Sequence, residues 1–319
     1  MGEGISPAVD AALASLAYLQ EPYIRSQLKE VPELSGWNLE WGPISFGPLD
    51  SVILLSKDTR MPSQLSSSAL VLRSRIPDCE RLFDNLDLSL SRLPWLQPGL
   101  LGAECGSTLV RSAKALMETL GGDHANTMLH RLRLDSPHAN LRVIGHSTGG
   151  ALACLVALWI RSVIEPLHGI AIRPRVFGAP TPGNAIFAEA FKRFFPQPTH
   201  FASSLDISPL TWSADGLEEC TKIYPKDLGP SALERGLLHV AKKEVTDLGY
   251  TQVKGQVWLH GKLRKGLRFQ EQAKWQHQIS QYLDLLRSKQ VEPSSAEANL
   301  GAGKSSRKRS GDHNSFTGD

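Results

Sequence analysis

The stretch from 140 to 160, Asn-Leu-Arg-Val-Ile-Gly-His-Ser-Thr-Gly-Gly-Ala-Leu-Ala-Cys-Leu-Val-Ala-Leu-Trp-Ile, decides the fold. Its apolar run Leu141 to Ile144 is typical of a buried strand, and residues 150–160 are small or apolar and predict a buried helix. Between them stands Gly-His-Ser-Thr-Gly at 145–149, a Gly-x-Ser-x-Gly pattern. With a strand before it and a helix after it, this pattern predicts a tight turn that exposes Ser147 as a nucleophile.

Glycine is required at two positions of this pattern for steric reasons. A serine that stands clear of its own backbone needs a sharp, strained turn, and side chains at Gly145 or Gly149 would collide there. The following helix would direct its backbone N–H groups and the positive end of its dipole at Ser147. The alternative interpretation is a glycine-rich turn between a strand and a helix, with an inert serine.

Length and composition indicate one domain. The chain has 319 residues, of which 41% are hydrophobic, enough for one sizeable core. We expect a single α/β domain over residues 1–290. From 291 to 319 the chain is rich in Ser, Gly, Ala and charged residues, which predicts a disordered tail. A net charge of +3, from 35 basic and 32 acidic residues, gives no general case for binding nucleic acid.

Neither a disulfide framework nor a targeting segment is evident. The four cysteines are scattered and form no Cys-x-x-Cys pair, which argues against disulfides and a zinc site. The longest strongly apolar stretch, Gly149 to Ile160, is shorter than the roughly 20 residues of a spanning helix, so we expect no transmembrane segment. The N-terminus lacks a basic region followed by an apolar run. The default expectation is a cytoplasmic address, with leaderless export as the alternative.

Strand-like and helix-like segments alternate along the chain. This alternation predicts an α/β fold with a mostly parallel central sheet and helices on both faces. Strands are expected at 36–46, 50–56, 69–72, 141–144, 175–177, 199–203 and 252–259, and helices at 7–19, 108–120, 150–160, 185–195 and 270–288.

Two motifs give the chain a family resemblance. The stretch 142–150 is similar to the nucleophile elbow of the class 3 (fungal-type) lipases in the α/β-hydrolase superfamily. Val-Phe-Gly-Ala-Pro-Thr-Pro-Gly-Asn-Ala-Ile-Phe at 176–187 is similar to the more specific second signature of that family, Phe-Gly-x-Pro-x-x-Gly-Asn-x-x-Phe. The resemblance runs through about residues 8–287, and it is thin before 69 and between 210 and 250. It implies the α/β-hydrolase fold.

The resemblance also implies a catalytic triad in the chain order Ser, Asp, His. Ser147 would be the nucleophile. Asp206 matches the family's aspartate that follows a strand and precedes a proline, and His277 matches its final histidine ahead of a helix that carries a tyrosine. The residues that compete for these roles are Asp215 and Asp227 for the acid, and His239 and His260 for the base.

Two departures from the family pattern concern the surroundings of the serine. The backbone N–H of Thr148 would be one oxyanion donor. The second would come from the loop after strand 69–72, where the family has Arg-Gly-Thr/Ser and this chain has Arg-Ser-Arg at 73–75, which leaves Ser74 or Arg75. The family's His-x-Gly-Phe is replaced by Glu-Cys-Gly-Ser at 104–107. A family lid would fall at 76–87, and an ordinary surface helix is the alternative.

The resemblance implies a serine carboxylic ester hydrolase that acts on lipid esters, as a triacylglycerol lipase or a phospholipase-like enzyme. Its substrate would be a lipid or another ester, met at a lipid–water interface, and the reaction would pass through an acyl-enzyme. No metal or other cofactor is required, and no clustered His, Cys, Asp or Glu set suggests one. The alternatives are a hydrolase-fold binding module that has lost activity, and an acyltransferase that uses the same acyl-enzyme.

Overall fold

The computed structural model describes residues 6–47, 50–57, 67–74, 87–95, 98–121, 130, 132, 139–164, 170–197 and 199–288. Three sequence expectations fall outside these ranges. They are the lid at 76–87, apart from its last residue, the alternative oxyanion residue Arg75, and the tail at 291–319.

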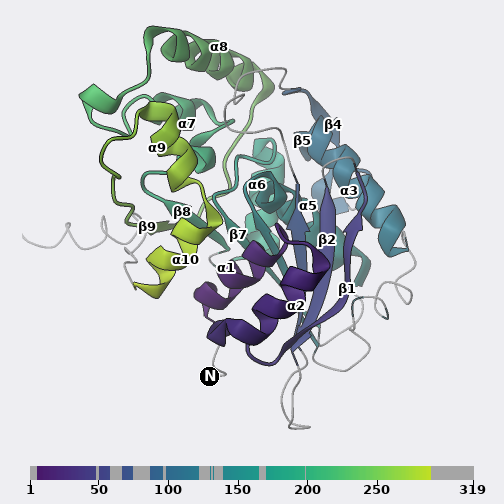
Figure 1. Ribbon diagram of the computed structural model, residues 1–319. Coiled ribbons are helices and arrows are strands. Elements are labelled where there is room, and N and C mark those ends of the chain that lie inside the picture. The colour runs from purple at the N-terminus through teal and green to yellow at the C-terminus, as the bar shows by residue number, and fades with distance from the viewer. Residues whose placement is uncertain are drawn as a thin grey trace, which may run out of the picture.

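A twisted sheet runs through the centre of the molecule (Figure 1). Within the described ranges it has seven strands in the order β1-β2-β3-β6-β7-β8-β9. The first three strands pair antiparallel, and every pair from β3 to β9 is parallel. The strands are β1 (Trp37–Ser45), β2 (Ser51–Lys57), β3 (Ser67–Arg73), β6 (Asn140–His146), β7 (Ala171–Phe177), β8 (His200–Ser203) and β9 (Val257–Leu259). A separate small ribbon joins β4 (Leu90–Arg92) and β5 (Glu104–Gly106).

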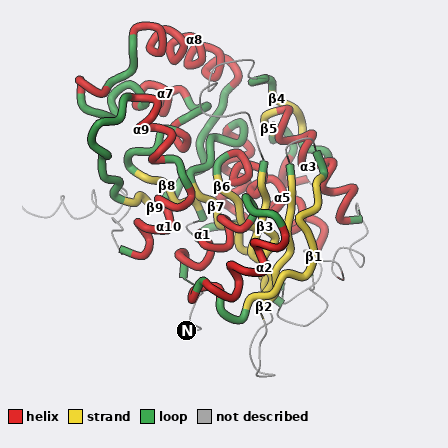
Figure 2. Tube along the Cα trace, viewed as in Figure 1, coloured by secondary structure: helices red, strands yellow, loops and turns green. Residues whose placement is uncertain are grey.

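Helices cover both faces of this sheet (Figure 2). Those described are α1 (Pro7–Leu16), α2 (Glu21–Glu30), α3 (Ser107–Leu120), α5 (Thr148–Ile164), α6 (Ala185–Phe194), α7 (Ala214–Glu219), α8 (Ala232–Leu248), α9 (Phe269–Gln276) and α10 (Ile279–Arg287). Alternate residues of one strand point to opposite layers. On β3, Leu70 and Leu72 pack in one core with α3, α5 and α6, whereas Ala69 and Val71 pack in a second core with α1, α2 and α10.

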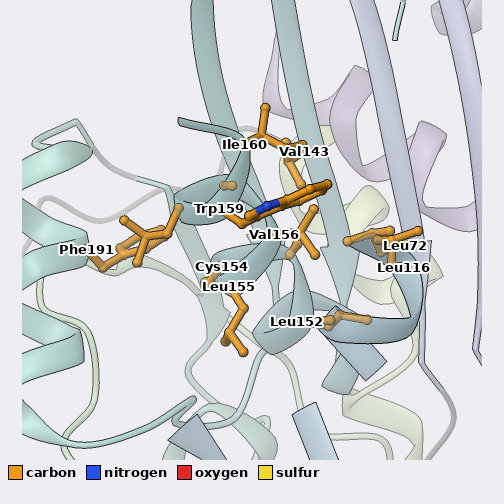
Figure 3. Packing of buried hydrophobic residues seen from close by; sticks show 14 of the residues in the cluster. Leu72, Leu116, Val143, Leu152, Cys154, Leu155, Val156, Trp159, Ile160 and Phe191 are labelled. Atoms are coloured by element: carbon orange, nitrogen blue, oxygen red, sulfur yellow. The ribbon is translucent and has the colours of Figure 1, made fainter. Parts of the chain in front are cut away.

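In the predicted strand–turn–helix at 140–160, β6 contributes residues to both cores and α5 packs in the first. All seven residues of β6 are buried. Helix α5 is apolar on every side because other elements surround it. Its Trp159 is fully buried and, as Figure 3 shows, lies among Val143, Val156 and Ile160. The segment that carries the Gly-x-Ser-x-Gly pattern is therefore rigidly embedded, which fixes the position of the turn.

The predicted mostly parallel sheet with helices on both faces is confirmed, whereas several element boundaries differ. The strand expected at 252–259 contains only Val257–Leu259, because Gly255 has a φ of +92° and interrupts the extended backbone. The helix expected at 7–19 ends at Leu16. The helix expected at 270–288 is two helices, because α9 packs on a third core with α8, whereas α10 packs on the α1 core.

Three helices, α2, α7 and α8, were not expected from the sequence. Within the described part of the chain, no helix combines the length and the apolarity that crossing a membrane requires.

Candidate active site

Ser147 stands on the sharp turn between β6 and α5. Its φ is +59°, in the left-handed region that side chains other than glycine rarely adopt. The neighbouring backbone holds this strained conformation. The Ser147 N–H donates to the carbonyl of Phe177 on β7 at 2.9 Å, and the Ser147 carbonyl accepts from Gly150 N at 2.8 Å. Such strain is concentrated at functional sites, where surrounding contacts enforce it.

The glycines at this turn are sterically obligatory. A Cβ at Gly145 would stand 2.1 Å from the carbonyl oxygen of Gly149, and a Cβ at Gly149 would stand 2.6 Å from the carbonyl oxygen of Leu72. Both neighbours are backbone atoms that cannot rotate away. The spacing of the motif therefore reflects how closely β6, α5 and the end of β3 approach one another.

The structure brings Ser147, Asp206 and His277 into one hydrogen-bonded chain. Nε2 of His277 lies 2.7 Å from Ser147 Oγ, and Nδ1 of the same ring lies 2.8 Å from Asp206 Oδ2. Asp206 follows β8, and His277 lies in the break between α9 and α10. Three segments separated by more than fifty residues in sequence thus meet at the carboxyl end of the parallel strands, where α/β sheets place their sites.

Asp206 is completely buried and receives three hydrogen bonds. The hydroxyl of Tyr282 donates to Oδ2 at 2.6 Å, beside the His277 contact, and the backbone N–H of Ser208 donates to Oδ1 at 2.9 Å. Burial by itself raises the pKa of this carboxyl. The charge of His277 and the three donors outweigh burial and hold the pKa below its usual value, so Asp206 is ionised.

The side chain of His146, the residue before the serine, hydrogen-bonds to the backbone carbonyl of His277. Burial lowers the pKa of His146 to about 3, so this imidazole is neutral. Its Nε2 lies 2.7 Å from the carbonyl oxygen of His277, which can only accept, so Nε2 carries the proton. Nδ1 then accepts from the hydroxyl of Tyr18 at 2.7 Å. The two histidine rings are also packed, with centroids 4.7 Å apart.

Sequence reasoning missed these supporting residues. Tyr282 carried a signal, because it lies five residues after His277 at a core position of the predicted helix. His146 and Tyr18 carried none, because their contact joins segments 128 residues apart.

The competing residues lie elsewhere. His239 is exposed on α8, and His260 is exposed just after β9. Asp215 stands in the first turn of α7, and Asp227 lies in a short 3-10 helix.

The two expected oxyanion donors lie near the serine. Thr148 is the first residue of α5, and the N–H groups of a first helical turn have no partner within the helix. Ser74 directly follows β3 and is buried, and its backbone nitrogen would be 3.0 Å from a Cβ at Gly149. Within the described ranges, no cluster of His, Cys, Asp or Glu is arranged to hold a metal ion.

The sheet order and the strained serine turn are those of the α/β-hydrolase fold. Residues 98–214 match the model of the lipase (class 3) family, which confirms the resemblance and the expected enzyme class, a carboxylic ester hydrolase. No curated protein shows a significant match.

Solved structures share the fold at low sequence identity. The crystal structure of M37 lipase superposes with a TM-score of 0.72 at 22% identity, covering 88% of this chain and 91% of that one. Two further structures, each covering more than four-fifths of both chains, superpose less closely. One is a mutant form of MDLA from Penicillium cyclopium, with 17% identity, 82% and 81% coverage and a TM-score of 0.50. The other belongs to a family of fungal lipases, with 15% identity, 83% and 82% coverage and a TM-score of 0.52.

Proposed function

We propose that this hydrolase cleaves lipid esters through a triad of Ser147, His277 and Asp206. The observation that carries the proposal is the pair of hydrogen bonds on one imidazole ring, 2.7 Å to Ser147 Oγ and 2.8 Å to Asp206 Oδ2. A nucleophile, a base and a group that orients the base are the arrangement that activates a serine.

The chemistry follows from the proton positions. Nδ1 of His277 donates to the Asp206 carboxylate, so Nε2 is left to accept from Ser147 Oγ. As Oγ attacks the ester carbonyl carbon, its proton passes to Nε2, and Asp206 stabilises the imidazolium. The proton is then given to the leaving alcohol, which departs from the acyl-enzyme. Water, deprotonated by the same imidazole, attacks that intermediate and releases the acid.

The oxyanion of each tetrahedral intermediate needs preorganised donors. We assign the backbone N–H of Thr148 as one, with the positive end of the α5 dipole behind it. The second is Ser74, or Arg75 beyond the described residues. Lipid esters as the substrate class, met at a lipid–water interface, rest on the family match over residues 98–214.

The test is hydrolysis of p-nitrophenyl esters of increasing acyl length by the wild type and by Ser147→Ala. We expect the mutant to retain at most about one part in 10⁵ of kcat, as for loss of a triad nucleophile. A long-chain optimum would support lipid esters, and a short-chain optimum would point to a simple esterase. Wild-type activity that survives Ser147→Ala would refute the triad. Product analysis with added alcohol separates hydrolysis from acyl transfer.

A further inference from the structure

A strongly basic loop lies immediately before the helix that ends at His277. The loop, His-Gly-Lys-Leu-Arg-Lys-Gly-Leu-Arg at 260–268, joins β9 to α9. Between Asp247 and Glu271 the chain carries no acidic residue. Lys262, Arg264 and Lys265 are all exposed, and Leu263 between them is 39% exposed. The protein as a whole has a net charge of only +3, so this loop is a local concentration of positive charge.

Two buried glutamines of α9 fix the backbone of this loop. Nε2 of Gln276 donates to the Lys262 carbonyl at 2.7 Å. Gln272, with its amide in the orientation that satisfies both groups, donates to the Arg264 carbonyl at 3.0 Å and accepts from the Arg264 N–H at 3.2 Å. In the part of the chain that the structure describes, no ion pair neutralises the three cations. These hydrogen bonds fix the backbone of the loop, while Lys262 and Lys265 are exposed to solvent and the Arg264 guanidinium lies over the ring of Trp275.

The first half of α8 carries exposed apolar side chains, and its start contacts the first turn of α9, which follows the basic loop. Leu233, Leu237 and Val240 follow at spacings of four and three residues, which places them on one side of the helix. They are 74%, 38% and 64% exposed, and the exposed Glu244 and Asp247 continue the same side toward the end of the helix. A neighbouring side of α8 packs in the core shared with α9. Gln270, in the first turn of α9, donates to the side chain of Glu234 at 2.5 Å. This contact joins the start of α8 to the first turn of α9, just after the loop, and Figure 1 shows α8 at the top of the view with α9 below it.

We propose that the loop 260–268 and the exposed face of α8 form a docking surface for an anionic lipid surface. Basic residues attract negatively charged headgroups, while exposed Leu and Val side chains enter the acyl boundary, which is the composition of interfacial anchors. This proposal rests on the proposed function, hydrolysis of lipid esters. It specifies the kind of lipid surface on which the proposed active site meets its substrate.

The location suits delivery of substrate to the site. Helix α9 has eight residues and so spans about 12 Å from the loop to His277. That length is close to half of the roughly 30 Å hydrocarbon thickness of a bilayer. A lipid whose headgroup lies at the loop is therefore within its own length of the catalytic histidine.

The test is co-sedimentation of the full chain with vesicles of phosphatidylcholine, with and without phosphatidylglycerol. All proteins carry Ser147→Ala so that the vesicles stay intact. We expect strong binding only to the anionic vesicles, weakening as salt shortens the range of the charges. Lys262→Gln with Lys265→Gln should weaken that binding about 25-fold, from roughly five-fold for each basic residue. The backbone contacts of the loop remain in this variant.

Matched control variants test whether vesicle binding depends on this particular surface, or only on the net charge and the exposed apolar area of the protein. Lys29→Gln with Lys192→Gln removes the same charge from exposed sites on α2 and α6, and it should leave binding unchanged. Leu233→Ser with Val240→Ser should weaken binding about ten-fold or more, from the apolar area withdrawn. The control for that pair is Leu101→Ser, which changes a leucine that is 72% exposed elsewhere.

These measurements distinguish failure of the docking proposal from failure of the catalytic proposal. Binding that ignores the loop variant, that is equal on neutral and anionic vesicles, or that is absent altogether would overturn the docking proposal. Hydrolysis of a soluble p-nitrophenyl ester by the enzyme with Ser147 intact is measured in parallel. Failure of that reaction with vesicle binding retained would refute the catalytic proposal alone.

Discussion

Replacing Tyr282 with phenylalanine removes one oxygen atom from the support of the proposed catalytic carboxylate. The hydroxyl donates to Asp206 Oδ2 at 2.6 Å and accepts from the backbone N–H of Ser203 at 3.2 Å. Tyr282 is fully buried, and the ring stays in place in the variant, so packing is preserved. The change therefore isolates two hydrogen bonds rather than a cavity.

The magnitude follows from those two contacts. A hydrogen bond to a charged group contributes about 1.5–3 kcal/mol, and the stranded Ser203 N–H costs about 1 kcal/mol more, giving a loss of about 3 kcal/mol. For a domain of this size that lowers Tm by about 6–12 °C. Ser208 still holds Oδ1, so we expect kcat to fall only about ten-fold, less than the roughly 100-fold that a 1 Å misplacement can cause.

A pH signature accompanies this loss. The pKa of Asp206 lies below its ordinary value in the folded protein, so its ionisation stabilises the fold above the unfolded-state pKa. That contribution is lost as pH falls through the lower, folded-state pKa. Removing the Tyr282 donor brings the pKa back up, so the stability of the variant should decline at a higher pH than that of the wild type.

The assays are thermal unfolding across acidic pH and ester hydrolysis at neutral pH. Tyr250→Phe is the matched control, because its buried hydroxyl donates at 3.1 Å to the carbonyl of Leu88, a neutral acceptor. We expect it to lower Tm by about 2–4 °C, from about 1 kcal/mol, with kcat unchanged. If Tyr282→Phe lowered Tm no more than this control and kept the wild-type kcat, the reasoning about Asp206 would be refuted.

Further predictions concern the elbow and a buried ion pair. The methyl group of Gly149→Ala would collide with the backbone at Leu72 and Ser74. If Ser74 is an oxyanion donor, we expect kcat to fall about 10²- to 10³-fold. An unchanged kcat would exclude that role. Asp10 is fully buried and lies 2.9 Å from Arg142 and 3.3 Å from Arg175. We expect Asp10→Asn to lower the free energy of unfolding, measured in urea, by about 3–5 kcal/mol. The exposed pair of Asp284 and Arg287 is the control, with a loss below about 1 kcal/mol for Asp284→Asn, and equal losses would contradict the argument.

The sequence predicted those features whose causes are local. The elbow was evident because a strand, a turn with two obligatory glycines and a helix are adjacent in the chain. Helix α8 was missed although it carried a local signal, the Ser231…Glu234 capping box that the structure contains. Its exposed Leu233, Leu237 and Val240 obscured the amphipathic pattern by which a helix is recognised.

Other features depend on contacts between distant segments. The break at His277 divides an apparently continuous helix because its halves pack against different cores. No window of sequence contains that information. The break has a consequence for chemistry, because it ends α9 with the histidine beside the serine and begins α10, whose Tyr282 reaches Asp206. The residues of the proposed triad were therefore predictable from motif order, whereas their mutual support was not.

His146 is a residue that supports the proposed site but that the order of the motifs does not predict. The Gly-x-Ser-x-Gly pattern leaves this position open, yet the side chain is buried and both ring nitrogens are engaged, with Tyr18 and with the His277 carbonyl. Because burial lowers its pKa to about 3, the ring stays neutral well below neutral pH, and its Nε2–H remains available to the carbonyl. A protonated His146 would instead place a positive charge beside His277, which accepts a proton in the mechanism that we propose. The buried, neutral state of His146 is therefore consistent with the proposal that His277 alone accepts the proton.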